Sequence, residues 1–284
     1  MITSLSQIAV ITNLTFREAW RRKLAWIALG LGGAFAALFG LGYYFICLET
    51  HERAGSPQIA NAIIMEASGM YLSAGLYVVN FLIVMLTVLT AVGVISSEIV
   101  SGTIHTIAAK PIRRFEILIG KWVGLAVMMS VYTVTMATVL MLLLLLVSGY
   151  GTAQPILVIA IMVLEGLAVL SVTLLGSTLF GTLTNGVLVF MLYGVAFIGG
   201  WVEQIGVLVK SQTAKDLGIL SSLFMPSEAL WRFASSLIQA PGSGPSFTAL
   251  TNVSVPSPAF VLYGIVYVVA LLLAAMVAFT RRDI

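Results

Sequence analysis

Six long apolar stretches are the feature that most constrains this sequence. They cover roughly residues 24–48, 72–95, 122–148, 155–180, 186–202 and 259–279. A helix needs about 20 mostly apolar residues, at ~1.5 Å each, to cross ~30 Å of hydrocarbon. Only 9% of the 284 residues are charged, whereas a soluble domain carries roughly a quarter. We therefore expect an all-α integral membrane protein with six transmembrane helices in one domain, residues 1–284.

The basic residues predict the orientation of these spans. Of the 14 Lys and Arg residues, ten lie on the side that holds both termini and the 96–121 loop: Arg17, Arg21, Arg22, Lys23, Lys110, Arg113, Arg114, Lys121, Arg281 and Arg282. The other four, Arg53, Lys210, Lys215 and Arg232, lie on the opposite side. Because cytoplasmic loops carry the excess of Lys and Arg, both termini are predicted to be cytoplasmic. The net charge of +3 is thus explained by topology, and nucleic acid is not an expected partner.

Two segments outside the spans are predicted to lie along the membrane surface. In residues 4–23, one helical face carries apolar side chains and the other carries Asn13, Arg17 and Arg21, which favours an amphipathic interfacial helix against anionic lipid. The alternative is a basic flank that only sets topology. Residues 203–258 are predicted to form an external helical segment between spans five and six. Spans four and five are expected to form a hairpin around a polar turn at 182–185.

The loop 96–121 between spans two and three carries the clearest sequence signals for the ends and starts of helices. Gly102 is expected to end the second span, and Thr103 to cap a short helix over residues 104–109. Pro111 forbids its continuation, and a new helix begins around Arg113 with Glu116 in its first turn. The result is a compact cytoplasmic helix that a partner protein can bind. The alternative is a solvated connector whose charges only enforce orientation.

This loop resembles a known family signature. The string Glu98…Gly102-Thr103…Pro111…Arg113/Arg114…Glu116…Gly120-Lys121 looks like the E-x-x-x-G-T…P-x-(R/S)…E-x-x-x-G-K motif of ABC-2 type permeases of bacterial ABC transporters. The resemblance implies a coupling helix seated in a groove of an ATPase subunit, with Arg113 or Arg114 neutralising Glu98. The coupling residues it implies are Glu98, Gly102, Thr103, Ile104, His105, Ile107, Lys110, Pro111, Arg113, Arg114, Glu116 and Lys121.

The ATP-hydrolysing machinery is expected in another polypeptide. Gly120-Lys121 is followed by Trp122, and position 115 is Phe, so the phosphate-binding loop of P-loop ATPases is not formed. No catalytic or metal site is predicted, since His51 and His105 are isolated and Cys47 is the only cysteine. The chain is thus predicted to be a non-enzymatic subunit without cofactors. ATP and Mg²⁺ would be bound by two partner ATPase subunits, beside a second permease copy or homologue in the bacterial inner membrane.

Glu165 lies near the middle of the fourth span, where an acid costs roughly 2.5–3.5 kcal/mol on insertion scales. One interpretation places it in a translocation path with Asn80, Thr87 and Thr90. The other is a protonated or hydrogen-bonded carboxyl that fixes helix packing. The largely apolar spans suit an amphiphilic or hydrophobic substrate, and the family resemblance implies that it is exported. An ATP-independent channel or secondary carrier that uses Glu165 is the alternative, whereas an intramembrane enzyme would need a second buried catalytic group.

Small residues predict close helix contacts at two places. Gly32, Ala36 and Gly40 share one face of the first span, and Gly120 and Gly124 share a face at the start of the third. Such stripes let helix backbones approach each other. They are compatible with packing inside the subunit and with a dimer interface.

Overall fold

The computed structural model describes residues 2–21, 23–102, 113–238 and 254–281, and within these ranges every regular element is a helix. The helices are α1 (Ile2–Arg21), α2 (Lys23–Arg53), α3 (Pro57–Ala91), α4 (Ser96–Val100), α6 (Arg114–Ser148), α7 (Pro155–Leu179), α8 (Thr182–Leu208), α9 (Gln212–Phe224), α10 (Ser227–Ser236) and α11 (Ala259–Arg281). In this part of the chain, six segments are long and apolar enough to cross a membrane: α2, α3 with α4, α6, α7, α8 and α11. The predicted all-α architecture with six spans is confirmed.

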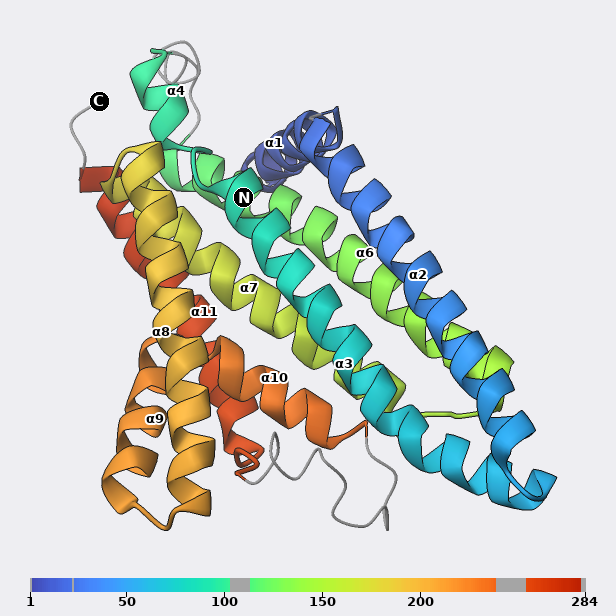
Figure 1. Cartoon of the computed structure of the whole chain (residues 1–284). Helices are drawn as coiled ribbons and strands as arrows, with labels where there is room; N and C mark the ends of the chain where they lie inside the picture. Colours follow the sequence, from blue (N-terminus) through green and yellow to red (C-terminus); the bar gives the residue numbers. More distant parts are fainter. Residues whose placement is uncertain (1, 22, 103–112, 239–253, 282–284) are drawn as a thin grey trace.

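The spans run side by side, and the non-spanning elements lie at their two ends (Figure 1). The N-terminal helix α1, the short helix α4 and the end of α11 lie at one end of the bundle. The α2–α3 connection and α9 lie at the other end. Helix α1, helix α4 and the end of α11 therefore share one side, which agrees with the side that the basic residues predict for them.

Helices α3 and α7 form the centre of the bundle. Leu76, Val79 and Ile83 on α3, with Ile161 and Met162 on α7, are at most 1% exposed. The outer helices carry large exposed apolar side chains, such as Leu38 on α2, Met191 on α8 and Leu262 on α11. A protein surrounded by lipid needs no polar coat on this surface, because lipid tails are as apolar as these side chains.

Helix α3 begins fifteen residues before the predicted second span, because local capping and packing extend it. Pro57 occupies its first turn, and the side chain of Ser56 accepts a hydrogen bond from the Ile59 amide at 3.4 Å, an arrangement that favours a helix start. Ala60 and Ile64, one helical turn apart, are buried in the first turns. Polar residues in this stretch, such as Gln58, Asn61 and Glu66, dilute its hydropathy, so hydropathy alone did not show that the helix extends beyond the predicted span.

The turn between α7 and α8 was also misplaced. It consists of Phe180 and Gly181, whereas residues 182–185 form the first turn of α8. Thr182 and Asn185 were taken as turn residues because they are polar. Their side chains instead make hydrogen bonds to the second span.

The described residues between spans five and six form the helices α9 and α10, so the predicted helical character is confirmed for this part of the segment. Helix α9 packs along α8 in the opposite direction, and α10 lies beneath α7 (Figure 1). Tyr263 and Tyr267 of α11 donate to the carbonyls of Leu223 and Phe224 at the end of α9, at 2.5 and 2.6 Å. These bonds connect the last span to α9.

Candidate functional site

The second span is interrupted between Ala91, the last residue of α3, and Ser96, the first of α4. Such an interruption leaves backbone amides and carbonyls without the partners that a continuous helix would give them. Within a transmembrane segment these groups must find partners in the protein. Side chains from three other spans supply them.

Ser177 on α7 accepts hydrogen bonds from two successive backbone amides of the interruption. Its Oγ lies 3.0 Å from the Ile95 nitrogen and 3.2 Å from the Ser96 nitrogen. Ser177 is fully buried. A side-chain oxygen from another helix therefore provides the N-terminal cap of α4.

Helix α8 binds the same interruption through its first turn. Asn185 Nδ2 donates to the carbonyl of Val92 and to that of Thr173 on α7, both at 2.9 Å. The hydroxyls of Thr182 and Ser96 are hydrogen-bonded at 2.9 Å. Asn185 thus joins the second, fourth and fifth spans at one point.

Lys121 on α6 completes this arrangement. Its Nζ donates to the Val94 carbonyl at 3.0 Å and forms an ion pair with Glu98 on α4, although the Lys121 residue is only 6% exposed. We call Lys121, Ser177, Thr182 and Asn185 the clamp. The clamp fixes the base of the 96–121 loop to α6, α7 and α8.

The residues predicted for the loop fall into two groups. Gly102 has the left-handed φ of 70° expected where a helix ends, and α6 begins at Arg114 with the Glu116 side chain accepting from the Arg113 amide at 3.0 Å. Arg114 Nη1 donates to the Thr280 carbonyl. Thr103, Ile104, His105, Ile107, Lys110 and Pro111 lie outside the described residues, so the coupling helix stays a prediction.

The partner of Glu98 differs from the expected one. The structure pairs it with Lys121, whereas the family resemblance had implied Arg113 or Arg114. Lys121 lies two turns further along α6, and its long side chain reaches back to the base of α4. The final lysine of the loop motif therefore has a structural partner that its spacing did not reveal.

The four residues predicted for a translocation path are all buried between helices, with at most 4% of each exposed. Asn80 Nδ2 donates to Glu165 Oε1 at 2.8 Å, which joins α3 to α7. Thr87 and Thr90 donate to the carbonyls of Ile83 and Leu86 in their own helix. The structure thus brings Asn80 and Glu165 together and directs the two threonine hydroxyls to their own backbone.

Comparison of the sequence with known protein families assigns the chain to one of them. Residues 9–284 match the sequence profile of the family described as ABC-2 family transporter protein. The chain belongs to the ABC-2 transporter family. No curated protein matches it in sequence. Members of this family are membrane subunits of ABC transporters that associate with ABC ATPases, so this ABC-2 permease is a transport subunit.

The N-terminal helix of the permease packs on α6 through the predicted glycine stripe. Thr12 Oγ1 donates to the Gly120 carbonyl at 3.2 Å. A Cβ added at Gly120 would lie 2.7 Å from Ile11, and one at Gly124 would lie 2.9 Å from the Thr12 carbonyl oxygen. The stripe therefore serves packing inside the subunit.

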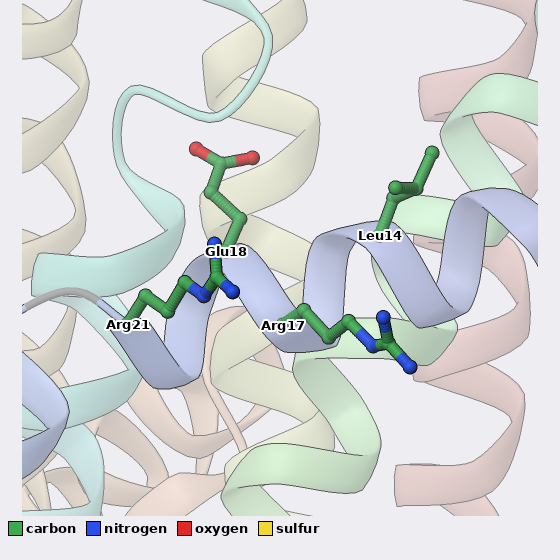
Figure 2. A pocket seen from close by; sticks show the side chains of 4 residues that line it. All are labelled: Leu14, Arg17, Glu18 and Arg21. Atoms are coloured by element: carbon green, nitrogen blue, oxygen red, sulfur yellow. The ribbon is translucent and has the colours of Figure 1, made fainter.

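The outer face of α1 carries charged side chains. Figure 2 shows Arg17, Glu18 and Arg21 with Leu14 around an open hollow of about 570 Å³. The two arginines are exposed. The interfacial position of α1 against anionic lipid stays a prediction, with which this exposed basic face is compatible.

A buried ionic cluster in the permease was not foreseen from the sequence. Arg232 on α10 pairs with Glu203 on α8 at 2.7 Å, and Ser254 Oγ donates to the same carboxylate at 2.6 Å. Beside them, burial raises the pKa of Glu228 to about 7, an effect that Arg232 opposes and Glu203 reinforces. The sequence had placed these charges in an external loop, because charged residues after an apolar stretch usually mark the exit from the membrane.

The clamp residues were missed as well, apart from Lys121. Serine, threonine and asparagine occur routinely in membrane helices, so their presence alone carries little information. Thr182 and Asn185 were assigned to a turn because the stretch 182–185 is polar. Only the packing of α8 on the second span reveals their role.

Proposed function

We propose that this chain exports an amphiphilic or hydrophobic substrate, driven by two ATPase subunits that contact its 96–121 loop. A second permease copy or homologue completes the complex in the bacterial cytoplasmic membrane, with both termini cytoplasmic. ATP and Mg²⁺ are bound by the ATPase subunits. Family membership supports the transport role, and the clamp supports the coupling role.

The single observation that carries the coupling proposal is the attachment of the loop base to three spans. Ser177, Asn185 and Lys121 each bond a backbone group of residues 92–96, and they come from α7, α8 and α6. A displacement of α4 therefore strains hydrogen bonds to all three helices at once. Packed helices transmit such a displacement because a close-packed core does not deform continuously but changes from one packing arrangement to another.

An apolar groove beside the clamp supports a hydrophobic substrate. The groove has a volume of about 560 Å³, and it lies between α3 and α8. Its lining is almost entirely apolar: Val88, Leu89, Val92, Thr182, Leu183, Gly186, Val187, Phe190 and Met191. Val92 lies in the interruption and Thr182 in the clamp, and both also line this groove. A movement of the loop would therefore alter the groove directly. We propose that it receives the apolar part of the substrate.

The ATP-independent alternative finds less support. An ion path through Glu165 requires access from both sides, and Glu165 is 1% exposed and bonded to Asn80 in a helix contact. This geometry favours a packing role for the pair. A channel or carrier would become the better explanation only if no ATPase associates with the chain.

The proposal is tested by purifying a tagged copy from its native host in mild detergent. We expect an ATPase to co-purify with the wild type. Gly102→Val should abolish this recovery, because a β-branched residue is strained at a φ of 70°. Lys121→Met should keep the ATPase but lose substrate-stimulated ATP hydrolysis. Gly33→Val is the control, since a Cβ there meets nothing within 4 Å.

Two results would contradict the proposal. Stoichiometric recovery of the tagged chain without any ATPase would exclude the ABC reading of the loop. Full substrate stimulation in Lys121→Met would exclude the clamp as the coupling element. Gly33→Val reports whether the substitution of a glycine by valine disturbs the recovery of the ATPase by itself.

The proposed orientation has an independent test. In a Cys47→Ala background, single cysteines at Ser97 and Gln212, both exposed and at opposite ends of the bundle, are treated with a membrane-impermeant maleimide on intact cells. We expect labelling at position 212 and none at position 97. The reverse pattern would place the termini outside.

A further inference from the structure

The contact between Asn80 and Glu165 contains two buried oxygens without a partner. Asn80 Nδ2 donates to Glu165 Oε1 at 2.8 Å, and the residues are 2% and 1% exposed. Among the described residues, neither Asn80 Oδ1 nor Glu165 Oε2 has a hydrogen-bond partner. Buried polar atoms are nearly always hydrogen-bonded, so two orphaned oxygens on one bonded pair require an explanation.

A single proton accounts for both oxygens. A carboxylic acid and a primary amide form a ring of two hydrogen bonds: the amide N–H donates to the acid's carbonyl oxygen, and the acid's O–H donates to the amide oxygen. The first bond of this ring is present between Asn80 and Glu165. A proton on Oε2 would turn that orphaned acceptor into a donor for the orphaned Asn80 Oδ1.

The electrostatic surroundings favour the same state. The ionisable groups that interact with Glu165 are Glu228 on α10, Tyr77 on α3 and Tyr193 on α8, each of which is an acid. The buried cations of the described chain are engaged elsewhere, Lys121 with Glu98 and Arg232 with Glu203. A carboxylate at Glu165 would be a buried charge without a counter-charge, which proteins avoid by protonation.

We propose that Glu165 is a proton-binding site that shares its proton with Asn80 and so fastens α3 to α7. The site is separate from the clamp, which bonds the interruption after α3 to α6, α7 and α8. If α3 and α7 part and water enters, the acid loses its amide acceptor and its proton passes to water, leaving a carboxylate. Closure of the contact takes one proton up again. This inference does not depend on which substrate or ATPase the chain uses.

Infrared spectroscopy of the chain in lipid tests the protonation directly. At alkaline pH, where Glu228 is ionised, we expect the wild type to show the carbonyl band of an un-ionised carboxylic acid, shifted in D₂O. Glu165→Gln should lack this band, and Glu228→Gln should keep it. Absence of the band from the wild type, or its persistence in Glu165→Gln, would overturn the proposal.

Thermal unfolding provides a second test, which distinguishes a protonated Glu165 from an ionised one. Gln can donate and accept as the neutral acid does, so we expect the midpoint of Glu165→Gln to equal that of the wild type. Asn80→Leu should lower the midpoint, because both carboxyl oxygens lose their partner. An equal loss in Glu165→Gln and Asn80→Leu would mean that the carboxylate is required. Stabilisation of the wild type, but not of Glu165→Gln, by sodium or potassium would assign the site to a cation and overturn the proton.

Discussion

Lys121 on α6 forms an ion pair with Glu98 on α4, and the same Nζ donates to the Val94 carbonyl at 3.0 Å. One side chain therefore satisfies a carbonyl exposed by the helix interruption and neutralises an acid at the base of the loop. The position of α4 depends on α6 through this contact. An exposed ion pair would not have this effect, because water competes for both partners.

Removal of this charge should weaken the fold measurably. In Lys121→Met we expect the free energy of unfolding to fall by about 2 kcal/mol, because Glu98 and the Val94 carbonyl both lose their buried donor. Equilibrium unfolding in mixed micelles measures the difference. Arg53→Gln is the matched control, since it breaks the Glu49–Arg53 pair, whose side chains are 59% and 81% exposed. That pair should contribute at most about 0.5 kcal/mol, and equal losses in the two variants would contradict the role of burial.

Ser177→Ala should expose the two amides that it caps. The Ile95 and Ser96 amides would have no acceptor, and the cost is about 2 kcal/mol for buried donors left unpaired. We expect hydrogen exchange of both amides to accelerate by about tenfold or more. Ser97→Ala is the control, because its exposed hydroxyl bonds the Gly93 carbonyl of its own segment and neither of the two capped amides. Unchanged exchange at Ile95 and Ser96 in Ser177→Ala would show that the cap is dispensable.

Glu228 should make stability depend on pH near neutrality. Its pKa is raised from 4.5 to about 7, chiefly by burial, so the folded chain holds a proton that the unfolded chain has already released. The free energy of unfolding should therefore fall as pH rises from about 4.5 through 7, by about 3 kcal/mol in total. Glu228→Gln should remove this dependence. The difference between wild type and variant, measured by thermal unfolding across this range, isolates the group, and parallel pH profiles would refute the assignment.

The contact of α1 with α6 depends on the absence of side chains at two glycines. Gly120→Leu should displace α1, because even a Cβ there would lie 2.7 Å from Ile11 and 3.2 Å from the Ile8 carbonyl oxygen. Trypsin should then cleave faster after Arg17 and Arg21, as α1 detaches. Gly30→Leu is the control, since a Cβ at that position meets nothing within 4 Å. Equal cleavage rates in the two variants would argue that α1 is not held by this stripe.

The sequence predicted well those features that arise from local physical chemistry. The six spans follow from apolar length alone, because a helix must satisfy its own backbone in lipid. The end of the second span at Gly102 and the start of α6 near Arg113 follow from turn and capping preferences within a few residues. The family resemblance also rests on a short, dense motif. These features need no knowledge of which helices are neighbours.

The errors at helix ends arose because a local pattern does not show which helices are neighbours. The start of α3 at Pro57 lies in a stretch of mixed hydropathy, where Ala60 and Ile64 are recognisable as buried only once their neighbours are in place. Thr182 and Asn185 were assigned to a turn, yet their side chains bond residues about 90 positions earlier in the chain. Local pattern carries no information about such partners.

Apolar length, basic-residue bias and the loop motif thus determined the fold class, the number of spans and the position of the loop that a partner would bind. Only the tertiary structure decided which polar side chains matter. Thr87 bonds a carbonyl of its own helix, whereas Ser177 bonds two amides of another, although both are hydroxyl residues within apolar spans. The physical reason is that a buried hydroxyl, amide or ammonium group bonds whichever partner helix packing brings within about 3 Å, and that packing is a property of the assembled bundle.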